Sequence, residues 1–332
     1  MSAYIYAHGR RGKASNPPPL AVSVPGLADG VRRRPLGSPP YLGEEPLPPP
    51  VQTPPALRRR EVALLGAIAS LLAGHAAAGA GDPEHGDAAH RRAMRDAPKL
   101  TCGLLLFHDF TALDLVAPQL LMATMMNTEV HLVAASETPV MSGSGLAIVP
   151  TKTYRTCPKD LDILFVPGGP AGTPEALQDD VLLDFLADRG SRARFVTSVC
   201  TGSVLLGAAG LLEGYAAASY WATRDLLPLF GARPRDERVV IDRNRITGGG
   251  ITAGIDFGLV LTARLRGESV ARLQALLLEY DPQPPYHGGT PKTARADTVE
   301  LARNILDREL REIRTTAERA GERRRVSRTG PF

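Results

Sequence analysis

Residues 99–312 are predicted to form an α/β domain with a mostly parallel sheet and helices on both of its faces. Short apolar runs typical of strands alternate along this stretch with longer runs typical of helices. The strand-like runs are apolar at nearly every position, as expected of strands that are buried on both sides. Turns rich in Gly and Pro follow several of them. Together these features are typical of a sheet built from repeated strand–helix units.

The first half of the domain is predicted to alternate between strands and a single helix. Pro118 can open a helix but cannot continue its hydrogen bonds, so the helix is expected to begin near this residue. The expected elements are a strand at 100–107, a helix over 114–127, a strand at 130–135, an extended hairpin region at 145–153 and a strand at 163–166.

The second half continues the alternation and ends in helices. Asp242, Arg243 and Asn244 predict the turn of a hairpin, because these residues favour tight turns. The expected elements are a helix over 174–189, a strand at 195–199, an apolar helix over 204–212, a hairpin over 239–246, and helices over 253–266, 269–279 and 298–314. Residues 313–332 are expected to form a solvated basic tail.

The chain before the domain differs in composition. Residues 1–57 are rich in proline and arginine and are expected to be disordered. In residues 58–81, three arginines precede a short apolar run and a set of small residues, as in an export signal of the twin-arginine type. The apolar run is too short for stable membrane insertion. Residues 82–98 are then a polar linker.

The position of this signal leaves two localisations open. An export signal belongs at the N-terminus, but this one starts near residue 58. If the signal is used, the domain is periplasmic. If the segment is instead an incidental apolar helix, the protein is cytoplasmic.

The most informative residue is Cys200, which stands between the strand at 195–199 and an apolar helix. A Cys at such a sharp turn is expected to project from the fold, with its sulfur near the N–H groups that open the helix. These groups and the helix dipole favour the thiolate, the nucleophilic form of the side chain. The alternative is a buried Cys that only fills space.

Other polar and glycine positions are expected to lie near Cys200. Gly168 and Gly169 follow the strand at 163–166, and Asp114 follows the loop after the first strand. In parallel sheets, sites form where the carboxyl ends of the strands meet. This convergence favours Cys200 as a nucleophile over Cys200 as core filler.

Composition excludes several classes of site. The cysteines Cys102, Cys157 and Cys200 are too few for a disulfide framework, and their spacing matches no zinc ligand set. Cys102 falls in the first strand and is interpreted as core. The net charge of +4 comes largely from arginines at the two ends of the chain. No nucleic-acid-binding motif accompanies them, so no nucleic-acid partner is expected.

Several motifs in order resemble the ThiJ/PfpI superfamily, and within it the bacterial isonitrile hydratases. These motifs are 113–118 (LDLVAP), 165–169 (FVPGG), 198–203 (SVCTGS), 206–212 (LGAAGLL), 247–256 (TGGGITAGID) and 279–286 (EYDPQPPY). The resemblance implies a flavodoxin-like sandwich with a nucleophile elbow, related to class I glutamine amidotransferases. It also implies a homodimer, which the apolar run at 120–126 supports only weakly, since a core role explains that run equally well.

The resemblance also implies roles for individual residues. Cys200 is the nucleophile, Asp114 is the acid/base, and Thr201 contributes beside the nucleophile. The backbone amides of Gly169 and Thr201 would form an oxyanion hole. Alternatives remain open: Asp114 as a helix N-cap, Thr201 as a residue that only opens the helix, and the glycines as a tight turn.

Substrate binding is expected at Gly168 and Tyr220. Tyr220 stands where many relatives carry a His, so the sequence does not predict a Cys–His–acid triad through this position. His108 and His287 are interpreted as surface or structural residues. No metal or cofactor is expected.

The function that follows is the hydration of an isonitrile to an N-substituted formamide, with a small molecule as the partner. A glyoxalase-like or amidase-like activity could use the same residues, because the fold does not fix the substrate. A non-catalytic sensor is the other alternative. Similar domains occur in AraC-type regulators, but those carry a helix-turn-helix region after the domain, whereas here one helix and a basic tail are expected. A redox sensor that oxidises Cys200 also remains open.

Overall fold

The computed structural model describes residues 97–329. The expectations for residues 1–57 and 58–81, and for most of the linker at 82–98, lie outside these described residues. Within them, no helix is both long enough and apolar enough to cross a membrane.

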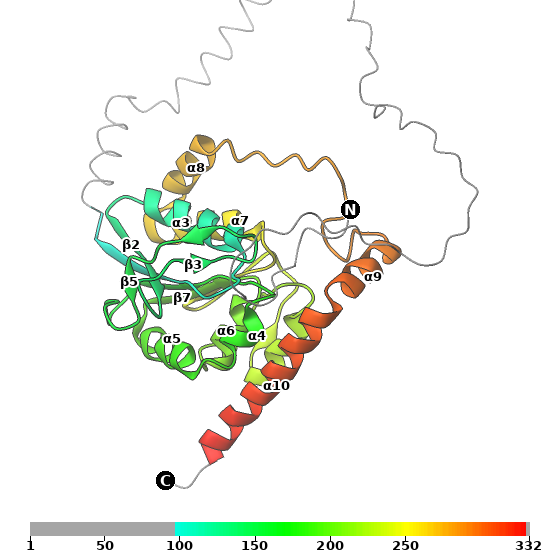
Figure 1. The fold of residues 1–332 in the computed structure, drawn as a ribbon. Helices are drawn as coiled ribbons and strands as arrows, with labels where there is room; N and C mark the ends of the chain where they lie inside the picture. Colours follow the sequence, from blue (N-terminus) through cyan, green and yellow to red (C-terminus); the bar gives the residue numbers. More distant parts are fainter. Residues whose placement is uncertain (1–96, 330–332) are drawn as a thin grey trace, which may run out of the picture. The chain divides into compact units, whose positions relative to one another are not determined.

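A seven-stranded sheet forms the centre of the domain, as predicted (Figure 1). Every neighbouring pair of strands is parallel except the hairpin at one edge, which pairs antiparallel. From that edge the order is β10 (Val239–Asp242), β11 (Arg245–Gly248), β7 (Phe195–Val199), β6 (Ile163–Val166), β1 (Leu100–Leu105), β2 (Thr128–Ala134) and β5 (Lys152–Thr153).

Helices cover both faces of this sheet (Figure 1). One face carries α3 (Ala112–Thr124) and α7 (Ala253–Arg266), with α8 (Glu268–Leu277) packed on α7. The other face carries α5 (Asp180–Arg192) and α6 (Gly202–Ala208), with α4 (Thr173–Ala176) and α10 (Asp307–Thr329) packed on α6. The remaining elements are β3 (Val140–Met141), β4 (Ala147–Ile148), β8 (Ala216–Ala217), β9 (Arg233–Pro234), the 3₁₀ helix η1 (Arg224–Phe230) and α9 (Ala296–Ile305).

The strand order places a site at one edge of the sheet. Leaving aside the short edge strand β5, the parallel strands run in the order β2-β1-β6-β7-β11, which is the flavodoxin-like order 2-1-3-4-5. The order reverses between β1 and β6, so the loops that follow these two strands diverge from a common crevice. Both the Gly168–Gly169 turn and the loop before Asp114 lie at this point.

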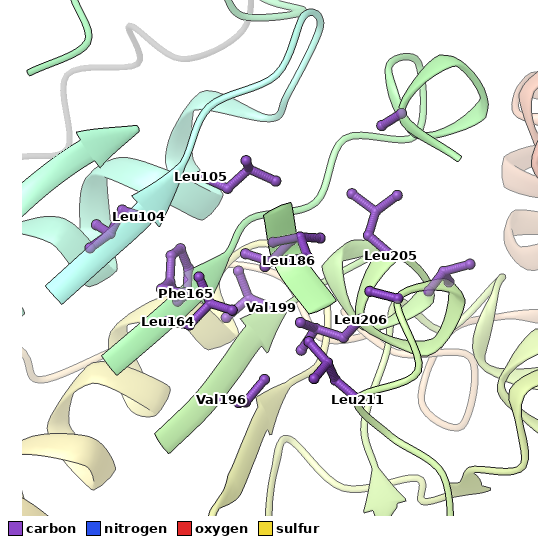
Figure 2. Packing of buried hydrophobic residues seen from close by; sticks show 14 of the residues in the cluster. Leu104, Leu105, Leu164, Phe165, Leu186, Val196, Val199, Leu205, Leu206 and Leu211 are labelled. Carbon is purple, nitrogen blue, oxygen red and sulfur yellow. The ribbon is translucent and has the colours of Figure 1, made fainter. Parts of the chain in front are cut away.

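The core lies between the sheet and its helices (Figure 2). All side chains of β6 and β7 are buried, which confirms the prediction from their mostly apolar sequences. Figure 2 shows side chains of β1, β6 and β7 beside Leu186 of α5 and Leu205 and Leu206 of α6. On the other face, the rings of Phe165 and Phe257 lie 5.5 Å apart, which joins β6 to α7.

Most of the predicted helices have different bounds in the structure. The helices expected over 204–212 and 269–279 are α6 and α8, whose ends shift by one to four residues, and three others differ more. The first helix begins at Ala112 rather than near Pro118, so Pro118 lies inside α3 and leaves the Asp114 carbonyl without its usual helical N–H partner. The helix expected over 174–189 is broken into α4 and α5, because Asp179 starts a new helix by accepting the Leu182 N–H at 3.0 Å. The last helix is likewise divided into α9 and α10.

The basic tail expected at 313–332 is instead helical as far as Thr329. Ile313, Ala317 and Ala320 recur at helical spacing on α10, and all three are buried in the core cluster. Arg323 donates to the Leu177 carbonyl at 3.0 Å. The many arginines on the remaining faces of α10 obscure this narrow apolar stripe in the sequence.

Candidate active site

Cys200 occupies a strained turn between β7 and α6, as the sequence predicts. Its φ of 55° lies in the left-handed region, which is uncommon for a residue other than Gly. Its N–H donates to the carbonyl of Gly249 at 2.7 Å and to that of Gly248 at 3.2 Å. A Cβ on Gly202 would lie 2.2 Å from the Val166 carbonyl oxygen, so only glycine allows α6 to start this close to β6.

The Cys200 side chain differs from the prediction in its burial and its charge. It does not project from the fold: its exposed fraction is 0%. Burial raises the pKa of the thiol well above its usual value, and the nearby Asp114 carboxyl raises it further. Hydrogen bonds from the backbone N–H groups of Thr201 and Ile251 lower the pKa, but by less. Burial and the nearby carboxyl therefore both act against the expected thiolate and favour the thiol.

Asp114 lies against this thiol from the first turn of α3. Its carboxyl is fully buried, and its Oδ2 accepts the Gly168 N–H at 3.1 Å. Burial raises its pKa from 3.8 to about 7, although hydrogen bonds from the Cys200 thiol and the Gly168 N–H oppose the rise. Its Oδ1 is buried without a hydrogen-bond partner among the described residues.

The alternative role of Asp114 as a helix cap is wrong. Thr111 occupies the N-cap position of α3, and Asp114 is the third residue inside the helix. The carboxyl of Asp114 instead bonds to Gly168, a residue 54 positions away in the sequence. This long-range contact joins the loop after β1 to the turn after β6, and the Thr111 N–H reinforces it by donating to the Gly168 carbonyl at 2.8 Å.

Gly168 is the residue that allows this close approach. A Cβ at Gly168 would lie 2.5 Å from the Thr201 nitrogen, 2.6 Å from the Cys200 Cβ and 2.8 Å from Asp114 Oδ2. Gly168 therefore forms part of the wall around the reacting pair. Its role in binding a substrate stays a prediction.

The backbone N–H groups near the sulfur are only partly the expected oxyanion donors: Thr201 is one of them, but Gly169 is not. The Gly169 N–H donates to Thr201 Oγ1 at 2.8 Å and is thus committed to a side chain. The Thr201 N–H does reach the sulfur, and its companion is the Ile251 N–H. Ile251 belongs to the Gly-rich segment after β11, but a backbone donor leaves no signature in the sequence.

The Thr201 hydroxyl belongs to a buried network that fixes the glycine turn. Thr173 Oγ1 donates to the Gly169 carbonyl at 2.8 Å and lies 2.7 Å from Thr201 Oγ1. Since Thr173 has given its single proton to Gly169, the Thr201 hydroxyl donates to Thr173 and accepts from Gly169. Thr201 also holds the N-cap position of α6, where its side chain makes no capping bond. Sequence reasoning did not find Thr173.

Tyr220 lies against the loop after β11. A Cβ on Gly250 would lie 3.1 Å from the Tyr220 ring, and the ring of Trp221 is 5.6 Å away. Tyr220 thus contacts the segment that carries Ile251, and its role in substrate binding stays a prediction. His108 and His287 are exposed, in keeping with their interpretation as surface residues.

The site is a carboxyl and a thiol that share protons inside the protein. Burial raises the pKa of both groups, that of the Asp114 carboxyl to about 7, so near neutral pH the pair as a whole can hold one proton or two. With one proton, the carboxylate can take the thiol proton as the sulfur attacks an electrophile, and can then deliver it elsewhere. In the described part of the chain, no group of three or more His, Cys, Asp or Glu side chains could hold a metal ion.

Comparisons with known proteins cover this site. The profile of the DJ-1/PfpI family matches residues 102–264. An isonitrile hydratase of Pseudomonas putida is 49% identical over 204 residues, which are 61% of this chain and 89% of that protein. The crystal structure of a THiJ/PfpI family protein from Pseudomonas syringae superposes with a TM-score of 0.65 at 47% identity, covering 67% of this chain and 91% of that one.

A second kind of relative shares only part of its length with the chain. The HTH-type transcriptional regulator GbdR of Pseudomonas aeruginosa is 29% identical over 189 residues, which are 54% of this chain and 50% of the regulator.

Proposed function

This chain belongs to the DJ-1/PfpI family, and on that premise we propose that it hydrates an isonitrile, R–N≡C, to the N-substituted formamide R–NH–CHO. The observation that carries the proposal is the buried contact between Asp114 and Cys200, in which the carboxyl pKa is raised to about 7. Isonitrile hydration needs a nucleophile and a proton at the same carbon atom. The similarity to the P. putida isonitrile hydratase over 89% of that protein supports the same reaction.

The first step adds the thiol across the isonitrile carbon. The Cys200 sulfur attacks the terminal carbon while Asp114 accepts the thiol proton, and Asp114 then gives this proton to the same carbon. A C–S bond and a C–H bond form, an S–H bond breaks, and the C≡N bond becomes C=N. The product is the thioimidate R–N=CH–S–Cys200, with Asp114 again a carboxylate. The N–H groups of Thr201 and Ile251 stabilise the sulfur while it carries negative charge.

The second step releases the product with water. Asp114 accepts a proton from water as the water oxygen bonds to the thioimidate carbon, and then passes this proton to the nitrogen, which leaves Asp114 a carboxylate. The resulting R–NH–CH(OH)–S–Cys200 collapses: the C–S bond breaks, and the hydroxyl proton returns through Asp114 to the sulfur. One water is consumed, and neither carbon nor sulfur changes its oxidation state.

The buried sulfur does not favour the redox-sensor alternative. Oxidants attack exposed thiolates of low pKa, whereas Cys200 is fully buried and its pKa is raised. The same pair could in principle serve the glyoxalase-like or amidase-like reactions, so the test includes their substrates.

The test is turnover of a simple alkyl isonitrile by the full chain, with the formamide measured by gas chromatography and mass spectrometry. We expect turnover by the wild type and none by Cys200→Ser. Asp114→Asn should lose about a hundredfold or more, in line with general acid–base catalysis. Rapid quenching should show the Cys200 peptide heavier by the mass of the isonitrile. Conversion of methylglyoxal to lactate or hydrolysis of an amide, with no formamide from the isonitrile, would contradict the proposal.

A further inference from the structure

The end of β11 and the loop that joins it to α7 contact the nucleophile through backbone groups. The carbonyls of Gly248 and Gly249 both accept the Cys200 N–H, and two residues later the Ile251 N–H reaches the Cys200 sulfur. The strained backbone of Cys200 is thus held entirely by this loop on its N–H side. The loop contains consecutive glycines, which restrict the backbone conformation least. Contacts with residues outside the loop are therefore needed to hold it in one conformation.

Arg238, the residue before β10, contacts both ends of this loop. Its backbone carbonyl accepts the Gly249 N–H at 2.9 Å. Its guanidinium donates to Asp256 Oδ2 at 2.6 Å and to Thr252 Oγ1 at 3.3 Å, in the first turn of α7 and just before it. A single residue therefore fastens the loop upstream and downstream of Ile251.

Tyr280 completes the arrangement from a third element. It follows α8, and its hydroxyl donates to the same Asp256 Oδ2 at 2.9 Å. Asp256 thus receives charge-assisted hydrogen bonds from two directions and is two-thirds shielded from solvent, with 31% of its side chain exposed. The side chains of Asp256 and Tyr280 themselves take no part in the chemistry of the Cys200–Asp114 pair.

We propose that Arg238, Asp256 and Tyr280 are positioning residues that hold the Gly248–Thr252 loop against Cys200 and so set the reactivity of its thiol. None of them touches the reacting atoms. They act through the backbone: a correctly placed loop keeps the Ile251 N–H on the sulfur and the Gly249 carbonyl on the Cys200 N–H. The inference deepens the proposed function, because it concerns the same thiol, but its test observes the thiol directly and requires no isonitrile turnover.

The experiment follows the titration of Cys200 in the full chain labelled with [3-¹³C]cysteine. The Cβ chemical shift responds to ionisation of the thiol and of the carboxyl beside it, and Cys200→Ser assigns the signal. Asp114 of α3 is the acidic group that acts on this thiol. The signal therefore reports the charge of the Cys200–Asp114 pair as a whole. Loss of the Ile251 donor would disfavour negative charge on this pair, so Asp256→Asn should raise the midpoint of the Cys200 signal by about half a pH unit or more.

Two further variants make the result decisive. Tyr280→Phe removes one hydroxyl and should shift the midpoint in the same direction by less. Asp236→Asn is the matched control. Asp236 also precedes β10 and also forms ion pairs, with Arg224 and, at 2.9 Å, with Lys292. These ion pairs do not involve the loop. The control should leave the midpoint of the Cys200 signal unchanged. None of the variants should change the signals of Cys102 and Cys157.

The proposal is overturned if Asp256→Asn, or Tyr280→Phe should the former not fold, leaves the Cys200 midpoint where it is in the wild type. A shift equal to that of Asp236→Asn would overturn it too, since it would reflect only the loss of a carboxylate near β10. If the wild type fails to hydrate isonitriles and the midpoint still shifts, the proposed function fails and the positioning role stands.

Discussion

Replacing Asp114 by Asn should stabilise the protein, and the gain should grow as the pH rises. The buried carboxyl has a pKa of about 7 in the folded chain, compared with 3.8 in a solvated one. Below pH 3.8 both states hold the proton, and the carboxyl costs no stability through ionisation. As the pH rises towards 7 the unfolded chain ionises and the folded one does not, so stability is lost across this window.

The magnitude follows from the size of the shift. Each pKa unit corresponds to 1.36 kcal/mol, so the shift from 3.8 to about 7 costs the wild type about 4 kcal/mol once the pH exceeds 7. At pH 5 the cost is about 2 kcal/mol, because only part of the window has been crossed. Asn does not titrate and can still accept the Gly168 N–H. The free energy of unfolding of Asp114→Asn minus that of the wild type should therefore be about 2 to 3 kcal/mol larger at pH 8 than at pH 5.

The assay is urea unfolding at both pH values, followed by the fluorescence of Trp221, the single tryptophan of the chain. Asp188→Asn provides a control of opposite sign. Hydrogen bonds and ion pairs with Arg192 and Arg189 lower the pKa of Asp188, so its carboxylate adds stability as the pH rises, and the variant should lose it. If the difference between Asp114→Asn and the wild type is the same at pH 5 and pH 8, Asp114 ionises in the folded chain as it does in water, and the reasoning is refuted.

Two of the four further predictions concern the same site, and two concern other parts of the protein. Hydration activity should fall as the pH drops below about 7, because the Asp114–Cys200 pair then gains a second proton; a flat kcat/KM between pH 5 and pH 8 would contradict this. Gly168→Ala should lose activity and about 1–3 kcal/mol of stability through overpacking, whereas Gly289→Ala, where a Cβ meets nothing within 4 Å, should do neither. The full chain should be a homodimer, since Leu120 of α3 and Leu276 and Leu277 of α8 are exposed, and light scattering should give about twice 35.4 kDa; the monomer mass at micromolar concentration would exclude it. In a bacterial host, a chain that starts just before Arg58 should reach the periplasm, and changing Arg59 and Arg60 to Lys should retain it; cytoplasmic retention of the unaltered chain would mean that the segment is no signal.

The central sheet could be predicted because its signals are local and repeated. β6 and β7 have the predicted bounds, since each is a short apolar run that ends at a residue able to turn the chain, Pro167 or Cys200. Since β1, β6 and β7 are parallel neighbours, the residues that follow them meet at one edge of the sheet, so the convergence of Asp114 and Cys200 could also be predicted. The breaks in the helices were harder to predict, because a single cap such as Asp179 divides a stretch of uniform helical propensity. The buried side of α10 was also hard to predict, because its residues are mostly alanines among many arginines and the segment as a whole is strongly polar.

The charge of Cys200 could not be predicted, because it depends on contacts between distant segments. Locally, a Cys at the start of a helix favours a thiolate, and the Thr201 N–H that supports this expectation does bond to the sulfur. Burial under the Gly168 turn and the approach of Asp114 act in the opposite direction and outweigh it. The consequence is chemical: an isonitrile carbon must gain both a sulfur and a proton, and a free thiolate could supply only the first. A thiol beside a carboxyl of pKa about 7 can supply both. Burial thus makes the sulfur less reactive on its own and makes the pair suited to an addition.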